Sequence, residues 1–347
     1  PWTVALLDPT KGNLPRRQID VAGTIKYSEA IAREGTPGVL FAASTGWGHA
    51  RNFEEHRQTL EVGGQAYLGN TLKQALFRIE DPLEKNQNLM KEVKEWGYAI
   101  VWTRRGSNLP PHASDREVAD NLLHFAESAI KNEVPFGIYS ISTVDGVPLH
   151  ASAVKLLLEE LGQEGAKYLV AIKITEPVFE ESTRLYLDDP AFAEKKIVQG
   201  WDVFYTRALK AGKRPDGTNQ CGATSGAAAC MVKAYNAMYN AATENDWDAI
   251  NRIQKVVTAT FLSMQGADKD AFPDLQIAKR VMGLGHPLTE SRSLKEVEKL
   301  VITLEKLAEN RETLWGVKLI AESLLIMGKN NPYSSPFYDR LEATSNL

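Results

Sequence analysis

The segment "KYLVAIKITEP" (167–177) contains the run of residues that decides the fold class. Five of the six residues from 168 to 173 are apolar or aromatic, and the sixth is Lys173. Continuously apolar runs of this length are typical of strands that are buried on both faces, as in parallel sheets. The lysine is either the hydrated end of such a strand or a functional group, because lysine is rarely buried without a partner.

Seven further strand-like runs occur along the chain, and helix-like stretches lie between them. With 168–175 they make eight, at 2–8, 38–44, 66–70, 98–103, 135–141, 196–202 and 219–225. Alternating strands and helices predict parallel β/α units, and eight units in this length fit a (β/α)₈ TIM barrel. A doubly wound open sheet is the alternative, although "DPTKGN" after the first run lacks the G-x-G-x-x-G pattern of a dinucleotide site.

The helical patterns change character near residue 245. Before it, Ser114 and Glu117 have the spacing of a capping box, and an apolar stripe follows at helical spacing. After it, no convincing strand follows, and "DWDAINRIQKVVTATFLSM" and "SLKEVEKLVITLEKLAE" predict helices. We therefore expect a catalytic barrel at 1–244 and a C-terminal helical segment at 245–347.

Composition places the chain among ordinary soluble globular proteins. It has 347 residues, of which 43% are hydrophobic and 24% charged. A net charge of -4 gives no basic footprint, so we expect no nucleic-acid partner. No apolar run approaches the roughly 18 residues of a membrane helix, so we expect no membrane partner. The first residues lack the pattern of a secretion signal, and a signal removed earlier stays open because the chain does not begin with Met.

The cysteines and histidines predict no metal and no cofactor. Cys221 and Cys230 are too few for a disulfide framework, and their spacing fits no zinc pattern. A reducing, cytoplasmic setting is the simplest interpretation of so few cysteines. The six histidines form no H-E-x-x-H or H-x-H cluster.

The position of Lys173 points to chemistry at its amine. The letters V-A-I-K match the strand lysine of protein kinases, but no G-x-G-x-x-G precedes them, and neither H-R-D nor D-F-G occurs. In a (β/α)₈ barrel, chemistry gathers at the C-terminal ends of the strands, and Lys173 lies near such an end. Apolar surroundings lower the pKa of an amine, and a neutral amine can attack a ketone to form a Schiff base.

Two other segments could serve this amine. Tyr139, in "GIYSIS", has the matching place on the preceding strand-like run, where its phenol could carry protons, or it is a core aromatic. In "AASTGWGHA" (42–50), a strand is followed by Ser44, Thr45 and a helix. Such a turn presents hydroxyls and backbone N–H groups to an anion, or it is a plain turn.

Together these segments resemble the dihydrodipicolinate synthase and N-acetylneuraminate lyase family of class I, Schiff-base-forming aldolases. The resemblance runs through most of the barrel, in matching order and spacing. Its segments are "ALLDPTKGNL", "GVLFAASTGWGHARNFEEH", "PFGIYSISTVDGVPL", "YLVAIKIT", "VQGWD" and "GATS".

The resemblance implies a mechanism and a set of site residues. Lys173 would form an imine with pyruvate or another 2-keto acid, and Tyr139 would relay protons. Aldol cleavage, aldol condensation or dehydration would follow, because the protonated imine is an electron sink. The implied substrate-binding residues are Ser44, Thr45, Gly200 and Thr224. Family members are often tetramers, so a homo-oligomer, tetramer or dimer, is expected.

The sequence departs from the family pattern in ways that bear on the second substrate. Trp47 replaces the family's glutamate, and Val144 replaces the arginine with which synthases grip a carboxylate, which disfavours dihydrodipicolinate synthesis. Residues 99–138 contain no tyrosine, whereas synthases donate one from this region across a subunit contact. Arg104 and Arg105 could grip an acidic substrate instead, or they are solvated loop charges.

Three alternatives to a pyruvate lyase stay open from the sequence. Within the family, the chain could be a keto-deoxy sugar-acid dehydratase or aldolase. Outside it, the chain could be a catalytically silent barrel that binds a small acid. A metal-dependent barrel isomerase is the third, and the scattered histidines argue against it. The second substrate, the reaction direction and the pathway cannot be read from the residues.

Overall fold

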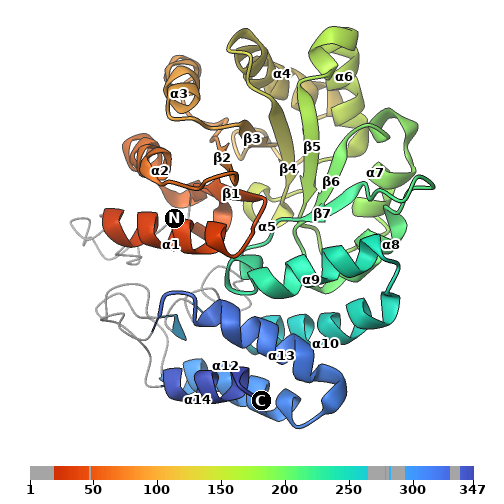
Figure 1. The fold of residues 1–347 in the computed structure, drawn as a ribbon. Coiled ribbons are helices and arrows are strands. Elements are labelled where there is room, and N and C mark those ends of the chain that lie inside the picture. The colour runs from red at the N-terminus through yellow and green to blue at the C-terminus, as the bar shows by residue number, and fades with distance from the viewer. Residues whose placement is uncertain (1–18, 47, 265–277, 279–280, 283–293, 329–336) are drawn as a thin grey trace.

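Seven parallel strands form the centre of the part that the structure describes (Figure 1). The computed structural model describes residues 19–46, 48–264, 278, 281–282, 294–328 and 337–347. The strands are β1 (Gly38–Phe41), β2 (Leu72–Leu76), β3 (Ile100–Arg104), β4 (Phe136–Ser140), β5 (Leu169–Ile174), β6 (Lys196–Gln199) and β7 (Cys221–Ala223). Each strand pairs in parallel with the next one along the chain, from β1 to β7.

Helices follow the strands and cover the outside of the curled sheet (Figure 1). Up to the end of the barrel they are α1 (Val21–Arg33), α2 (Phe53–Gln65), α3 (Leu83–Glu95), α4 (Asp115–Lys131), α5 (Ser142–Asp145), α6 (Ala151–Ala166), α7 (Thr183–Asp188), α8 (Tyr205–Ala211) and α9 (Val232–Thr243). The capping box that begins α4 is confirmed: Ser114 Oγ accepts from Glu117 N–H, and the Glu117 carboxylate accepts from Ser114 N–H.

The sequential strand order confirms the (β/α)₈ architecture and excludes the doubly wound sheet, in which the order reverses. Burial on both faces is also confirmed, since all of β4 and all of β5 except Val170 are buried. The strand expected at 2–8 lies outside the described residues.

The strand expected at 66–70 is wrong, because the structure places that strand at Leu72–Leu76. Residues 66–70 form the turn before it, in which Gly69 has φ +57° and Tyr67 is exposed. The true strand was missed because it contains Lys73 and Gln74. Both are satisfied internally: the Lys73 amine donates to the Gly64 carbonyl, and the Gln74 side chain accepts from the Trp102 indole at 2.8 Å.

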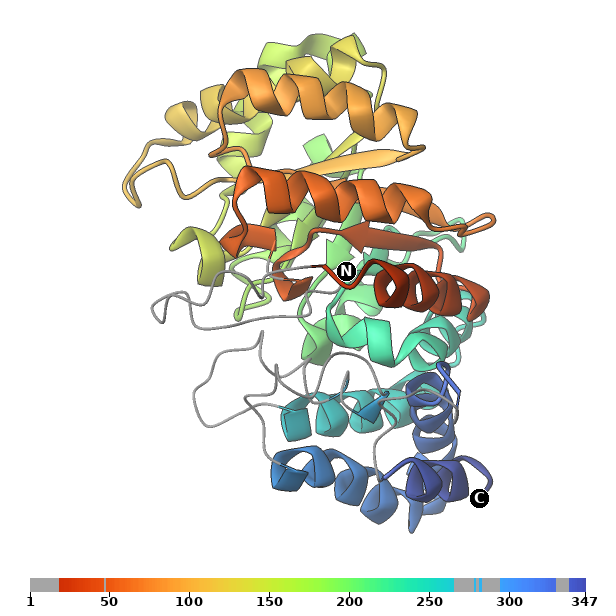
Figure 2. The same cartoon turned by 90° about the vertical axis from the view of Figure 1, so that its left-hand side faces the viewer.

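The C-terminal helices lie together at one end of the molecule. They are α10 (Trp247–Met264), α12 (Leu294–Ala308), α13 (Arg311–Leu324) and α14 (Tyr338–Ser345). Figures 1 and 2 show α12, α13 and α14 on the opposite side of the molecule from α3, α4 and α6. The link to the barrel is α10, which contacts α8 and α9 on one side and α12 and α13 on the other. The division at residue 244 therefore separates helices that pack against each other.

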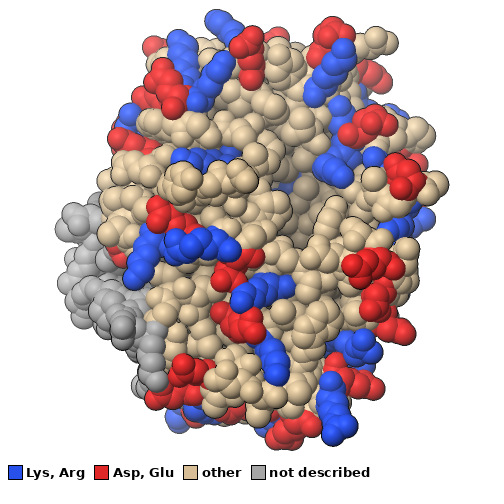
Figure 3. All heavy atoms as spheres, in the orientation of Figure 1, with Lys and Arg blue, Asp and Glu red and all other residues tan. Residues whose placement is uncertain are grey.

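The surface shows no segregation of charge on the face drawn in Figure 3, where basic and acidic side chains are interspersed. None of the helices in the described ranges is long and apolar enough to cross a bilayer.

Candidate active site

A cavity lies at the C-terminal ends of the strands and brings together most of the predicted site residues. Ser44 and Thr45 line it just after β1, Tyr139 and Lys173 near the ends of β4 and β5, and Gly200 just after β6. This is the end of a (β/α)₈ barrel at which catalytic groups gather. Thr224 does not line the cavity; its neighbours Ser225 and Gly226 do.

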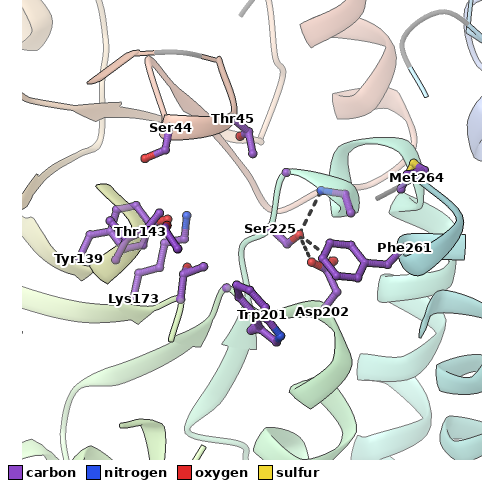
Figure 4. A pocket seen from close by; sticks show the side chains of 15 residues that line it. Ser44, Thr45, Tyr139, Thr143, Lys173, Trp201, Asp202, Ser225, Phe261 and Met264 are labelled. Carbon is purple, nitrogen blue, oxygen red and sulfur yellow. Dashed lines mark hydrogen bonds between the residues drawn. The ribbon is translucent and has the colours of Figure 1, made fainter. Parts of the chain in front are cut away.

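Lys173 and Tyr139 face each other across neighbouring strands. They are direct register partners in the parallel pair of β4 and β5. The Lys173 amine nitrogen lies 3.9 Å from the centroid of the Tyr139 ring, so it contacts the face of the ring (Figure 4). The adjacency expected from the sequence is therefore present.

The Lys173 amine is buried and makes no hydrogen bond or ion pair with the residues that the structure describes. The residue is only 5% exposed. Burial lowers the pKa of the amine from 10.5 to about 7, and the negative charge of Asp202 opposes this shift. The contact with the Tyr139 ring also favours the protonated amine, but desolvation outweighs both effects. A substantial fraction of the amine is therefore neutral, and nucleophilic, near pH 7.

The surroundings of Tyr139 keep its phenol protonated. The residue is 2% exposed, and burial raises its pKa well above 10. The hydroxyls of Thr175 and Ser44 lie close enough to oppose this rise. Neither makes a hydrogen bond of ordinary geometry within the described residues, although both are buried. A buried polar atom without a partner is costly, so both hydroxyls are free to bind a ligand in the cavity.

The turn after β1 presents a hydroxyl more readily than backbone donors. Ser44–Gly46 is one turn of 3₁₀-helix, and the N–H groups of Gly46 and Gly48 donate to the Ala43 carbonyl at 2.9 and 3.1 Å. Those two donors are therefore not available to an anion. The cavity-facing group of this turn is the unpartnered Ser44 hydroxyl.

Gly200 is placed at the cavity for a steric reason. A Cβ at this position would lie 1.9 Å from Thr175 Oγ1 and 3.2 Å from the Ile174 carbonyl oxygen. Only glycine allows the end of β6 to approach the end of β5 this closely. The close approach brings the segment after β6 beside Lys173.

A buried carboxylate, Asp202, completes the polar side of the cavity and was not predicted from the sequence. Ser225 Oγ lies 2.7 Å from both Asp202 carboxylate oxygens, and the Tyr235 hydroxyl also donates to Asp202 (Figure 4). Burial raises the pKa of Asp202, and these two donors oppose the rise. The signal was present in "VQGWD", because an acid two residues after a strand-end glycine faces the same cavity as the glycine.

Glu176 positions the segment that follows Tyr139. Its carboxylate accepts from Ser140 Oγ at 2.6 Å and from Ser142 N–H at 2.9 Å. It is 4% exposed, which strengthens both bonds. The segment that it fixes contributes Ile141 and Thr143 to the cavity wall.

Arg104 and Arg105 neither line the cavity nor extend into solvent. Each is 2% exposed. Arg104 pairs with Asp145 and, at 2.7 Å, with Glu80. Burial raises the pKa of Asp145 to about 6, and Arg104 opposes this rise. Arg105 donates to the Pro110 carbonyl at 2.6 Å. The sequence-based alternative of solvated loop charges is therefore wrong, and neither guanidinium reaches the cavity.

Fold and site together define a (β/α)₈ barrel that holds a buried amine at the C-terminal end of its strands. In the described ranges, no group of three or more His, Cys, Asp or Glu side chains could hold a metal ion. The amine, a neutral phenol and a carboxylate are the titratable groups in the cavity. They suit carbonyl chemistry through a Schiff base.

Several solved structures share this architecture. A dihydrodipicolinate synthase from Aquifex aeolicus is 18% identical with a TM-score of 0.66, over 87% of this chain and 96% of that one. A variant of the Sulfolobus solfataricus 2-keto-3-deoxygluconate aldolase is 15% identical with a TM-score of 0.68, over 87% and 94%. A catalytic lysine mutant of the Ruminococcus gnavus sialic acid aldolase is 14% identical with a TM-score of 0.68, over 88% and 92%.

The sequence itself gives no such match, since no family model and no curated protein matches it. At identities this low, the likeness to the solved structures is a likeness of fold. The resemblance to the dihydrodipicolinate synthase and N-acetylneuraminate lyase family is thereby confirmed for the fold.

Proposed function

We propose that this chain is a Schiff-base-forming lyase of the dihydrodipicolinate synthase and N-acetylneuraminate lyase family, acting on pyruvate or another 2-keto acid. The observation that carries the proposal is the buried Lys173 amine, with its pKa lowered to about 7, against Tyr139 at the strand ends. The fold likeness supports it, and one of the similar enzymes, the Ruminococcus gnavus sialic acid aldolase, has a catalytic lysine.

The proposed reaction begins with the neutral Lys173 amine. Its nitrogen attacks the ketone carbon, and the ketone oxygen leaves as water after taking up protons, which gives the iminium. Tyr139, whose phenol stays protonated, relays those protons. Loss of a proton from C3 then gives an enamine. The enamine carbon adds to an aldehyde, or the reverse steps cleave an aldol.

The carboxylate of the 2-keto acid binds on the Ser44 side of the cavity in this proposal. Ser44 and Thr175 offer buried hydroxyls that have no partner within the described residues, and Thr45 lines the same wall. Gly200 leaves room for the bound acid. The roles of Thr45 and Thr224 in binding stay predictions from the resemblance. We further propose a cytoplasmic homo-oligomer that needs no cofactor.

Exchange of the pyruvate methyl protons with deuterated water tests this function, because exchange requires the enamine. We expect the wild-type chain to catalyse exchange and Lys173→Ala to abolish it. Lys195→Met is the matched control: Lys195 is also partly buried with a lowered pKa, but it lies outside the cavity. Binding of pyruvate without exchange would show a silent barrel and overturn the proposal.

A further inference from the structure

The cavity has two chemically different sides. Figure 4 shows Tyr139, Thr143 and Lys173 on one side of the view and Phe261 and Met264 on the other, with Trp201 between them. The first side carries the polar groups described above. The second side, formed by Trp201, Phe261 and Met264, is apolar, and we call these three residues the apolar wall.

The apolar wall is built by two separate elements. Trp201 follows β6, and Phe261 and Met264 lie one turn apart on α10, so they share one face of that helix. The rings of Trp201 and Phe261 meet edge to face, with centroids 6.3 Å apart. Leu262, the next residue on α10, is 50% exposed and lies outside the cavity lining. One face of α10 therefore presents the wall to the cavity.

The charges of the cavity disfavour a second anion. Among the described lining residues, Lys173 is the sole cation, and in the proposed reaction it is bonded to the first substrate. Asp202 is a buried carboxylate in the same lining. Arg104 and Arg105 are committed to Asp145, Glu80 and backbone carbonyls. An acid group on the second substrate would therefore be desolvated beside a carboxylate without a cation to pair with.

We infer that the second reactant is an uncharged aldehyde with an apolar body, aromatic or branched aliphatic, that lies against Trp201, Phe261 and Met264. This inference rests on the proposed function. In the reaction, C3 of the enamine bonds to the aldehyde carbon, and the aldehyde oxygen takes a proton to become a hydroxyl. Water then hydrolyses the iminium, which releases the 4-hydroxy-2-keto acid and returns the Lys173 amine.

The charge of the aldehyde can be varied at nearly constant size. The test compares methyl 4-formylbenzoate with 4-formylbenzoate as partners for pyruvate, with glyceraldehyde as a polyhydroxylated third partner. Product formation is followed by mass spectrometry, and kcat/KM is measured for each aldehyde. We expect the ester to be preferred to both others by about tenfold or more. Equal or better use of the acid or of glyceraldehyde would overturn the inference.

Substitutions on α10 locate the preference. Phe261→Arg places a cation in the wall, and we expect the ratio of kcat/KM for ester over acid to fall by about tenfold or more. Leu262→Arg adds the same charge one residue away, outside the cavity, and should leave the ratio unchanged. If Phe261→Arg does not fold, Phe261→Ala should lower the ratio in the same direction. An unchanged ratio in a folded Phe261 variant would overturn the inference.

Failure of this inference is distinguishable from failure of the proposed function. Pyruvate proton exchange needs no aldehyde, so it reports the first half-reaction alone. Exchange without the expected aldehyde preference would refute the apolar partner while the lyase stands. Absence of exchange in the wild-type chain would refute both.

Discussion

The Lys173 amine contacts the face of the Tyr139 ring, 3.9 Å from its centroid, and the two residues are register partners at the ends of β4 and β5. The amine therefore meets the ring, while the hydroxyl of Tyr139 lies near Ser44 and Thr175. This arrangement separates two roles of one side chain. The ring shapes the surroundings of the nucleophile, and the hydroxyl is placed to move protons.

Tyr139→Phe tests this separation, because it removes the hydroxyl and keeps the ring. Imine formation with pyruvate should remain detectable, while exchange of the methyl protons should slow by about 10²–10⁴-fold, the usual contribution of a positioned proton carrier. Borohydride trapping reports the first quantity, and proton exchange in deuterated water the second. Exchange at the wild-type rate would remove Tyr139 from the proton relay.

The rate of imine formation should depend on pH through the Lys173 amine. Because the lowered pKa is about 7 and the neutral amine is the nucleophile, the trapping rate should rise as the pH increases through about 7 and then level off. Asp202 holds this pKa up, so Asp202→Asn should move the midpoint to lower pH. Glu180→Gln removes the same charge at an exposed position and should leave the midpoint in place. A midpoint near 10, or a shift to higher pH in Asp202→Asn, would contradict the electrostatics.

Stability gives an independent view of the same amine. The pKa of Lys173 is about 7 in the folded chain, against 10.5 as the ordinary value, so the unfolded chain holds one more proton between these limits. The contribution of Lys173 to stability therefore improves as the pH rises from about 7 to about 10. Lys173→Met should stabilise the fold at pH 6, by a few kcal/mol on the order of one pKa unit per 1.4 kcal/mol, and the advantage should shrink toward pH 10. Urea unfolding at both pH values measures this. A constant difference would mean that the amine is well solvated.

Arg104 should matter for stability rather than for substrate binding. Arg104→Leu leaves Asp145 buried without its cation, and loss of one partner of a buried pair costs about 3–5 kcal/mol. Arg207→Leu breaks an exposed pair with Glu180 and should cost less than about 1 kcal/mol. Urea unfolding compares the two variants. Wild-type stability with a raised KM in Arg104→Leu would instead place this residue in the substrate site.

The sequence predicted the elements whose burial is uniform. β4 and β5 are apolar on both faces and were found from their runs, and with them Tyr139 and Lys173 at the strand ends. The strand β2 was misplaced because Lys73 and Gln74 make it look polar, and their partners in α2 and β3 are set by the three-dimensional fold.

The parts of the site that were missed depend on packing between distant segments. Phe261 and Met264 reach the cavity because α10 lies across the strand ends, and no local pattern reveals which face of a helix closes a barrel. Arg104 and Arg105 were left open because burial of a guanidinium depends on partners in other β/α units. Asp202 was within reach, since it follows Gly200 by two residues.

Reductive trapping with mapping of the modified residue tests the central claim most directly. The chain is incubated with pyruvate and borohydride, digested, and its peptides are weighed. We predict the mass of one reduced pyruvate adduct on the peptide that contains Lys173, and none in Lys173→Ala. A chain that binds pyruvate yet gains no adduct, or that carries it on another lysine such as Lys73 or Lys195, would contradict the account.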